Sequence, residues 1–225
     1  MSIFIIKIIA CITMFLDHIK YAIPMTNNYV TKYLGRFAFP LFAFIITEGY
    51  VHTKDLRKYY KRLIIFAIIS QIPFMLFRTL VGEYLMLNVI FTLLLGLISI
   101  TVYDKIEKRY FSIPICISII CLGHFLKVDY GWFGVTSVFL LYVLRKTKDF
   151  QMICLAILTA IYYYSKGFFN IININIILFY ICSIFPFVFI YFYNGQLGKK
   201  IKYFFYWFYP VHMLILYYIN YFLYK

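Results

Sequence analysis

The chain has 225 residues, of which 64% are hydrophobic, 23% aromatic and only 13% charged. Soluble globular domains carry roughly 25% charged residues and disordered chains are poor in hydrophobic ones, so this composition excludes a soluble enzyme and a disordered protein. It indicates an all-α, polytopic integral membrane protein. One span needs roughly 20 apolar residues, and about nine spans would use most of the chain.

Nine apolar stretches, taken in chain order, predict a helical bundle of about nine transmembrane helices. The expected number ranges from eight to ten, because the fifth to seventh stretches are short and one of them could be tilted or re-entrant. No internal repeat or linker divides the chain, so residues 1–225 are expected to form a single transmembrane domain. The stretches are 3–23, 34–51, 62–80, 86–103, 110–126, 130–145, 150–164, 174–193 and 203–223.

The net charge of +14 is concentrated in alternate connections between these stretches: 54–62, 105–109, 145–148 and 199–202. In a soluble protein this charge would suggest nucleic acid, but the short cytoplasmic loops of membrane proteins retain lysine and arginine. The pattern therefore predicts a multi-pass protein of the cell (plasma or inner) membrane, with a cytoplasmic N-terminus and no nucleic-acid partner. The five cysteines show no ligand spacing, so we expect neither a metal site nor a disulfide framework.

The first stretch contains three ionisable residues, which a membrane tolerates only beside a cavity or a partner. Lys7 and His18 are eleven positions apart, which at about 100° per residue places both on one helical face, about 16 Å apart along the axis. Asp17 is turned about 100° away and needs a partner on another helix. Two structural alternatives stay open: Lys7 could snorkel at the membrane edge, and His18 could be a hydrogen-bonded core histidine.

Further polar residues fall near the predicted membrane surfaces. On the outer side these are Arg36, Asn88, Asp129 and Tyr130, and on the inner side Glu48, His52, Arg57, Lys58, Lys61 and Arg62. The basic run is either a topological signal alone or a phosphate-binding mouth. Ser70 and Gln71 precede Pro73, and a proline break persists in a membrane where it is packed or lines a cavity. His212 follows Pro210, so it either binds a carbonyl that the proline frees or acts in catalysis.

Several short strings along the chain are specific enough to identify a family. They are Asp17-His18, Gly35-Arg36-Phe37-Ala38-Phe39-Pro40, Glu48-Gly49, His52-Thr53, Ser70-Gln71-Ile72-Pro73-Phe74, Leu87-Asn88, Tyr130-Gly131 and Phe208-Tyr209-Pro210-Val211-His212. With these strings the chain resembles the TraX family over nearly its whole length. The founding protein of that family acetylates the N-terminus of conjugative pilin. The family is similar to a wider clan of transmembrane acyltransferases, many of which carry a basic residue, ten intervening residues and a histidine in an early span, as Lys7 and His18 do.

The resemblance implies an acetyltransferase that moves an acetyl group from cytoplasmic acetyl-CoA to an extracytoplasmic acceptor, either a pilin or other peptide N-terminus or an envelope glycan. His18 would be the general base, or would carry the acetyl group covalently. Asp17 would organise the site, and Arg36 and Asn88 would hold the acceptor or the oxyanion. Acetyl-CoA would bind at the inner mouth, and its arm would pass through a tunnel from Lys7 to His18. The donor-binding candidates are Lys7, Glu48, His52, Arg57, Lys58, Lys61 and Arg62, and further site candidates are Ser70, Gln71, Asp129, Tyr130 and His212.

An alternative class is a proton-coupled small-molecule transporter in which Asp17, His18 and Glu48 form a proton path. Such a protein predicts inverted repeats and paired broken helices, and the sequence shows no repeat. A membrane scaffold without catalytic activity gives no reason for ionisable groups on one helical face.

Overall fold

The computed structural model describes residues 1–82, 85–168, 174–199 and 202–224, so the predicted basic connection 199–202 lies partly outside the described residues. The helices are α1 (Ile3–Ala22), α2 (Tyr29–Leu34), α3 (Ala38–His52), α4 (Leu56–Arg78), α5 (Val89–Lys105), α6 (Arg109–Phe125), α7 (Gly131–Val143), α8 (Lys148–Ser165), α9 (Ile174–Ile184), α10 (Pro186–Tyr191) and α11 (Lys202–Tyr224). Three 3-10 turns accompany them: η1 (Pro24–Thr26), η2 (Gly35–Phe37) and η3 (Thr79–Val81). No strand forms within these ranges, which confirms the predicted all-α class.

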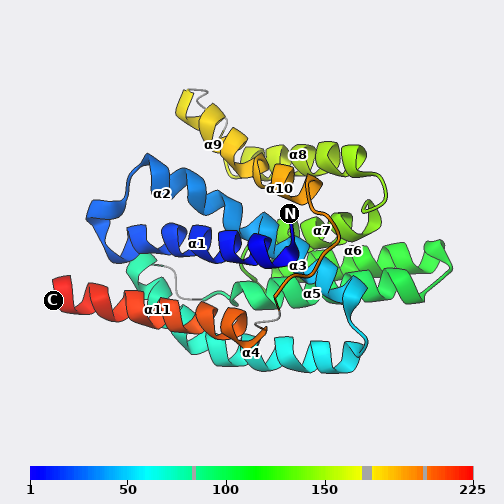
Figure 1. Ribbon diagram of the computed structural model, residues 1–225, viewed down its shortest axis with the longest axis horizontal. Coiled ribbons are helices and arrows are strands. Elements are labelled where there is room, and N and C mark those ends of the chain that lie inside the picture. Colours follow the sequence, from blue (N-terminus) through cyan, green and yellow to red (C-terminus); the bar gives the residue numbers. More distant parts are fainter. Residues whose placement is uncertain (83–84, 169–173, 200–201, 225) are drawn as a thin grey trace.

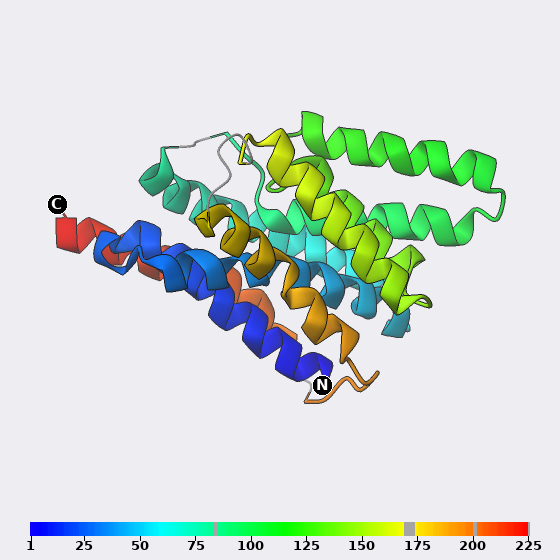
Figure 2. The same cartoon turned by 90° about the horizontal axis from the view of Figure 1, so that it is seen from above.

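The helices run back and forth along the long axis of the molecule (Figure 1). The turn after α1 and the C-terminal end of α11 lie toward one end, and the connections α3–α4 and α5–α6 lie toward the other. Seen from above, α6 lies at one edge of the bundle and α1 at the opposite edge (Figure 2). Two hydrogen bonds hold the N-terminus against the connection before α11. Asn194 N–H donates to the Met1 carbonyl at 3.1 Å, and Ile3 N–H donates to the Gln196 carbonyl at 2.9 Å.

Three of these passes are long and apolar enough to cross a membrane by composition: Tyr29–His52, Leu56–Val81 and Ile174–Tyr191. The first and last differ from a single straight span. Tyr29–His52 consists of α2, η2 and α3 in sequence, and Ile174–Tyr191 breaks before Pro186 into α9 and α10. A proline is tolerated at a first helical position and ends the preceding helix, which explains the second break. The nine membrane crossings stay a prediction.

Small residues let the central helices approach closely. A Cβ atom at Gly96 of α5 would lie 2.6 Å from Cβ of Val138 on α7, and one at Gly134 of α7 would lie 2.4 Å from Cγ2 of Thr92 on α5. Lipid tails are as apolar as leucine, so the hydrophobic effect does not drive helices together within a membrane. Membrane helices associate instead through close packing at small residues such as these. Large apolar side chains are exposed on the outer helices instead, for example Ile72 on α4 and Phe125 at the end of α6. This inside-out pattern supports a lipid-facing perimeter.

Candidate active site

A polar cavity of about 190 Å³ lies among α1, η2, α3, α4, α5, α8, α11 and the connection before α7. Its size exceeds a few water molecules but is below the 300–1,000 Å³ of most cofactor pockets. The cavity can therefore hold a reacting group but not a nucleotide. Its ionisable lining residues are Asp17, His18, Arg36, Arg78 and Asp129, with the tyrosines Tyr21, Tyr130, Tyr162 and Tyr209.

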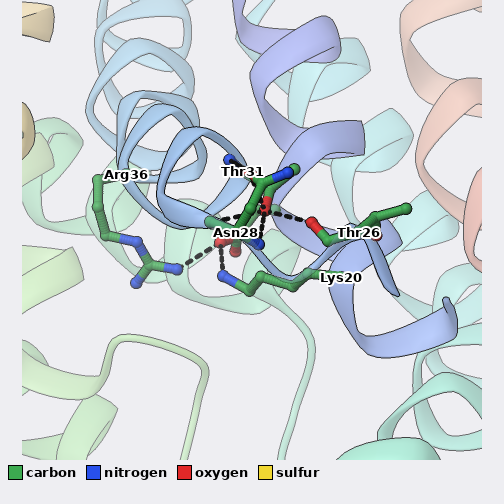
Figure 3. Close-up of polar contacts among 6 residues, drawn as sticks. Lys20, Thr26, Asn28, Thr31 and Arg36 are labelled. Atoms are coloured by element: carbon green, nitrogen blue, oxygen red, sulfur yellow. Dashed lines mark hydrogen bonds and ion pairs between the residues drawn. The ribbon is translucent and has the colours of Figure 1, made fainter. Parts of the chain in front are cut away.

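Asp17 finds the partners that the sequence requires of it. Its Oδ1 accepts a hydrogen bond from Lys20 Nζ at 2.5 Å and a second, also short, from Arg36 Nη2. Figure 3 shows the Lys20 and Arg36 side chains converging on one carboxylate oxygen from α1 and η2. The Lys20 and Asp17 side chains are only 6% and 14% exposed and that of Arg36 is 19% exposed, so the three charges form a largely buried cluster.

The turn between α1 and α2 brings Arg36 back to the end of α1. Asn28 begins α2 with a reciprocal cap: its Oδ1 accepts from Thr31 N–H at 3.1 Å, and its own N–H donates to Thr31 Oγ1 at 3.3 Å. Thr31 Oγ1 also donates to the Thr26 carbonyl at 2.8 Å, as Figure 3 shows. A cap of this type satisfies the amides that a helix leaves unpaired at its start. The turn is therefore rigid where it positions η2.

Gly35 allows η2 to contact Asp17 directly. A Cβ atom at this position would lie 2.3 Å from Asp17 Oδ1 and 2.8 Å from its Cγ. Any larger residue would displace the carboxylate that Arg36 binds. The string Gly35-Arg36 thus combines the space and the charge that Asp17 needs.

His18 contacts His212 of α11 across the helix interface, with His18 Nδ1 2.7 Å from His212 Nε2. Lys7, on the same face of α1, lies 5.3 Å from the ring centroid of Phe205, also on α11. The predicted common face of Lys7 and His18 is therefore confirmed, because both side chains meet one neighbouring helix. His18 lines the cavity, whereas Lys7 is not among its described lining residues.

The connection before α7 has a strained backbone at the cavity wall. Tyr130 has a φ of 64°, a left-handed conformation that costs a non-glycine residue energy and that functional sites often retain. Its ring stacks on Phe39 with centroids 4.0 Å apart. Thr92 Oγ1 donates a short hydrogen bond to the Asp129 carbonyl, and Asp129 N–H donates to the Leu87 carbonyl at 2.9 Å. Burial raises the pKa of the Asp129 carboxyl to about 6, against the influence of nearby Arg78.

Asn88 and Gln71 hold the start of α5 against α4. Asn88 Oδ1 accepts from Ile90 N–H at 3.0 Å, and Nδ2 donates both to the Ala67 carbonyl at 2.7 Å and to Gln71 Oε1 at 2.9 Å. Both amide hydrogens are thus donated within the scaffold. Asn88 therefore fixes the helix pair and has no amide hydrogen left for the predicted contact with an oxyanion. Ser70, next to Gln71 on α4, is fully buried, and its hydroxyl makes no hydrogen bond to the described residues.

The predicted donor-binding residues gather at the other end of the bundle. His52 Nδ1 lies 3.5 Å from Glu48 Oε2 near the end of α3, and neither residue lines the cavity. Asp55 caps α4 by accepting from Lys58 N–H at 2.9 Å, and this contact holds the pKa of Asp55 below its usual range. Arg57, Lys58 and Lys61 are exposed on the first turns of α4.

Arg62 links this basic end to α11. Its guanidinium lies over Tyr59 at 5.8 Å and beside the Tyr206 hydroxyl. Because Lys7 lies on Phe205, two predicted donor ligands meet the same short stretch of α11. The predicted tunnel is not open in this structure: the described cavity reaches Met14, which is buried, and Lys7 lies beyond it.

Residues 2–220 match the family described as "TraX protein". The chain belongs to the TraX family. It is 29% identical over 235 residues to a protein of Dichelobacter nodosus named "Probable fimbrial assembly protein FimC, serogroup H1", and the match covers 96% of this chain and 94% of the relative. No solved structure matches the chain.

Four ionisable residues of the cavity lining were not predicted from the sequence: Tyr21, Arg78, Tyr162 and Tyr209. Arg78 stands at the end of α4, where a single arginine is typical of a membrane edge, and only the fold turns it into the cavity. Tyr209 is buried, and its hydroxyl lies near the Val89 amide but makes no hydrogen bond to the described residues. Its neighbour Pro210 was the available signal, because proline breaks often line cavities.

Proposed function

We propose that this TraX-family chain is a membrane-embedded acetyltransferase with its N-terminus in the cytoplasm. It takes an acetyl group from cytoplasmic acetyl-CoA and transfers it to an amine or hydroxyl of an extracytoplasmic acceptor, a peptide N-terminus or an envelope glycan. The fimbrial name of the Dichelobacter relative supports a pilus-related acceptor. The proposed protein crosses the membrane several times, with its basic connections on the cytoplasmic side.

The observation that carries the proposal is the chamber around His18. It combines an imidazole that can take up a proton with two guanidinium groups and two carboxylates in one cavity of about 190 Å³. Ionisable groups buried within a membrane span are costly and by default indicate a functional site. The cavity has room for a thioester and the acceptor group that attacks it, but not for a nucleotide. The nucleotide of the donor would therefore bind outside the cavity, at the basic end of the bundle.

The donor would approach from the basic end. Its nucleotide phosphates would bind among Arg57, Lys58, Lys61, Arg62 and Lys7 by charge attraction. From Lys7 its arm must extend about 16 Å along α1 to reach His18. Met14 lies on this line, and an unbranched thioether can change rotamer at little cost. We therefore assign Met14 as the side chain that moves when acetyl-CoA enters.

In the transfer step, the acceptor nitrogen or oxygen attacks the thioester carbonyl while His18 takes its proton. The new bond to the acetyl carbon forms, the carbon–sulfur bond breaks, and the proton leaves with the CoA thiolate. Arg36 is placed to stabilise the oxyanion, because its buried Nε makes no hydrogen bond to the described residues. Asp17 holds Arg36 in position and balances its charge.

The experiment compares cell envelopes from three strains: one with the chain, one without it, and one with His18→Gln at the same membrane level. Mass spectrometry of envelope proteins and glycans is expected to find acetyl groups that are present only in the first strain. Identical acetylation in all three strains would remove the proposed activity. Acetylation that needs the chain but not His18 would keep the activity and overturn the role of the histidine.

A further inference from the structure

The protonation of the histidine pair can be read from its hydrogen bonds. His212 Nδ1 lies 2.7 Å from the Phe208 carbonyl, and a carbonyl can only accept, so Nδ1 carries the proton. In neutral His212 the other nitrogen, Nε2, then has a lone pair. Since this atom lies 2.7 Å from His18 Nδ1, His18 must donate its Nδ1 proton to it. His18 Nε2 is left with a lone pair and is free to act as a base.

The surroundings favour this neutral arrangement over its reverse. For His18 Nδ1 to accept, His212 would need a second proton and a positive charge. His212 is only 4% exposed and packs against Phe208 and Tyr209, and no carboxylate is described in contact with it. An isolated charge buried among aromatic rings is costly. The neutral pair with His18 as donor therefore has the lower energy.

The two rings also have the geometry of an in-plane hydrogen bond. Their planes differ by 13°, and their centroids are 5.0 Å apart. Because the two nitrogen atoms are only 2.7 Å apart, the rings meet edge to edge and do not overlap face to face. Of the two, only His18 is among the described residues that line the cavity. His212 thus contacts the cavity through the His18 ring.

We propose that His212 is a positioning residue that holds His18 in the tautomer with the proton on Nδ1 and the reactive lone pair on Nε2. The role in turnover rests on the proposed acetyl transfer, whereas the tautomer does not. When His18 Nε2 takes the acceptor proton, His18 becomes positively charged. Its Nδ1–H still donates to the lone pair of His212 Nε2, which stabilises this charge, while His212 Nδ1 still donates to Phe208. The proton on His18 Nε2 then leaves with the CoA thiolate, and His18 is neutral again.

The first test measures the tautomer and needs no activity. The chain has four histidines, so nitrogen NMR of histidine-labelled protein in lipid gives few signals, and single substitutions assign them. His18 is expected to show a protonated Nδ1 and an unprotonated Nε2 at neutral pH. In His212→Phe, which keeps a ring but accepts no hydrogen bond, the Nε2–H form is expected to appear. A wild-type His18 with its proton on Nε2 would overturn the proposal.

The second test is kinetic and uses the acceptor that the envelope comparison identifies. Loss of the hydrogen-bond partner that orients a metal-bound histidine typically lowers activity about 10- to 100-fold, and we expect a loss of the same order here. We expect His212→Phe to lower kcat by this amount at an unchanged KM for acetyl-CoA. His212→Gln, whose Oε1 can accept from His18, is expected to recover part of the loss. His124→Gln, on the exposed end of α6, is the matched control and is expected to keep the wild-type kcat.

The two proposals fail in different ways. A wild-type protein without acetyl transfer but with the expected His18 tautomer would remove the acetyltransferase and leave the histidine pair. A wild-type kcat in His212→Phe, or a kcat in His212→Gln no higher than in His212→Phe, would remove the positioning role and leave the acetyltransferase. If His212→Phe does not fold, the wild-type NMR signal of His18 still decides the tautomer.

Discussion

Asp17→Asn tests the buried charge cluster at the end of α1. The amide keeps the shape of the carboxylate but removes its charge, so Lys20 and Arg36 are left facing each other around a neutral oxygen. All three side chains are less than one-fifth exposed, so solvent screens them weakly. Removing one partner of a buried ion pair typically costs about 3–5 kcal/mol, because the remaining charge is uncompensated.

That energy is large enough to measure by heating. In chains of this size about 1 kcal/mol shifts Tm by roughly 2–4 °C, so Asp17→Asn is expected to lower Tm by roughly 6–20 °C. The assay heats detergent-solubilised protein and follows the monodisperse fraction by size-exclusion chromatography. Asp149→Asn is the matched control, because it makes the same chemical change on the exposed first turn of α8 and is expected to leave Tm nearly unchanged.

A double variant separates charge from packing. Adding Arg36→Gln to Asp17→Asn removes one of the two stranded cations, so the pair of substitutions is expected to cost less than the sum of the single ones. Strict additivity, or an Asp17→Asn protein that melts with the wild type, would show that the cluster does not hold η2 against α1.

Three further predictions concern the donor path and the cavity wall. Lys7→Met is expected to raise the KM for acetyl-CoA about 10- to 100-fold, because one charge-assisted contact is worth roughly 1.5–3 kcal/mol. Lys7→Arg keeps the charge and is expected to keep the wild-type KM. An unchanged KM in Lys7→Met would exclude a donor contact. Met14→Trp fills the inner end of the cavity and is expected to lower turnover at least tenfold. The volume-conserving Met14→Leu is expected to keep a turnover near that of the wild type. Equal turnover in Met14→Trp and the wild type would place the donor path elsewhere. Because burial raises the pKa of Asp129 to about 6, the folded protein binds a proton that the unfolded chain releases above about pH 4, so stability is lost as pH rises from about 4 to 6. Asp129→Asn is expected to remove about 2–3 kcal/mol of that pH dependence, and parallel melting curves for both proteins across this range would contradict the shift.

Much of the fold followed from local patterns. Apolar stretches gave most helix positions to within a few residues, for example 110–126 against α6 (Arg109–Phe125), because helix length and hydropathy are local properties. The break before Pro186 and the 3-10 turn around Arg36 were not predicted. Both depend on how a segment packs against its neighbours, which one sequence does not encode locally.

The candidate site was predicted unevenly for the same reason. Asp17 and His18 were found because an ionisable residue inside an apolar stretch needs a partner. Their partners, Arg36 and His212, lie 19 and 194 positions away, and only the tertiary fold brings them together. Arg78 and Tyr209 gave weak signals, since arginine at a helix end and tyrosine in an aromatic run are common in membrane proteins. The amide of Asn88 has a scaffold role that its sequence position did not reveal.

The rate of acetyl transfer in the His18→Gln variant tests the central claim most directly. Proteoliposomes would be loaded with envelope extract, [14C]acetyl-CoA would be added outside, and label in the enclosed extract would be counted for wild type, His18→Gln and His124→Gln. Loss of a general base typically lowers a rate about 10²- to 10⁴-fold, so His18→Gln is expected to fall by at least about 100-fold while His124→Gln keeps the wild-type rate. A correctly inserted His18→Gln protein that labels the extract as fast as the wild type would contradict the assignment of His18 as the base.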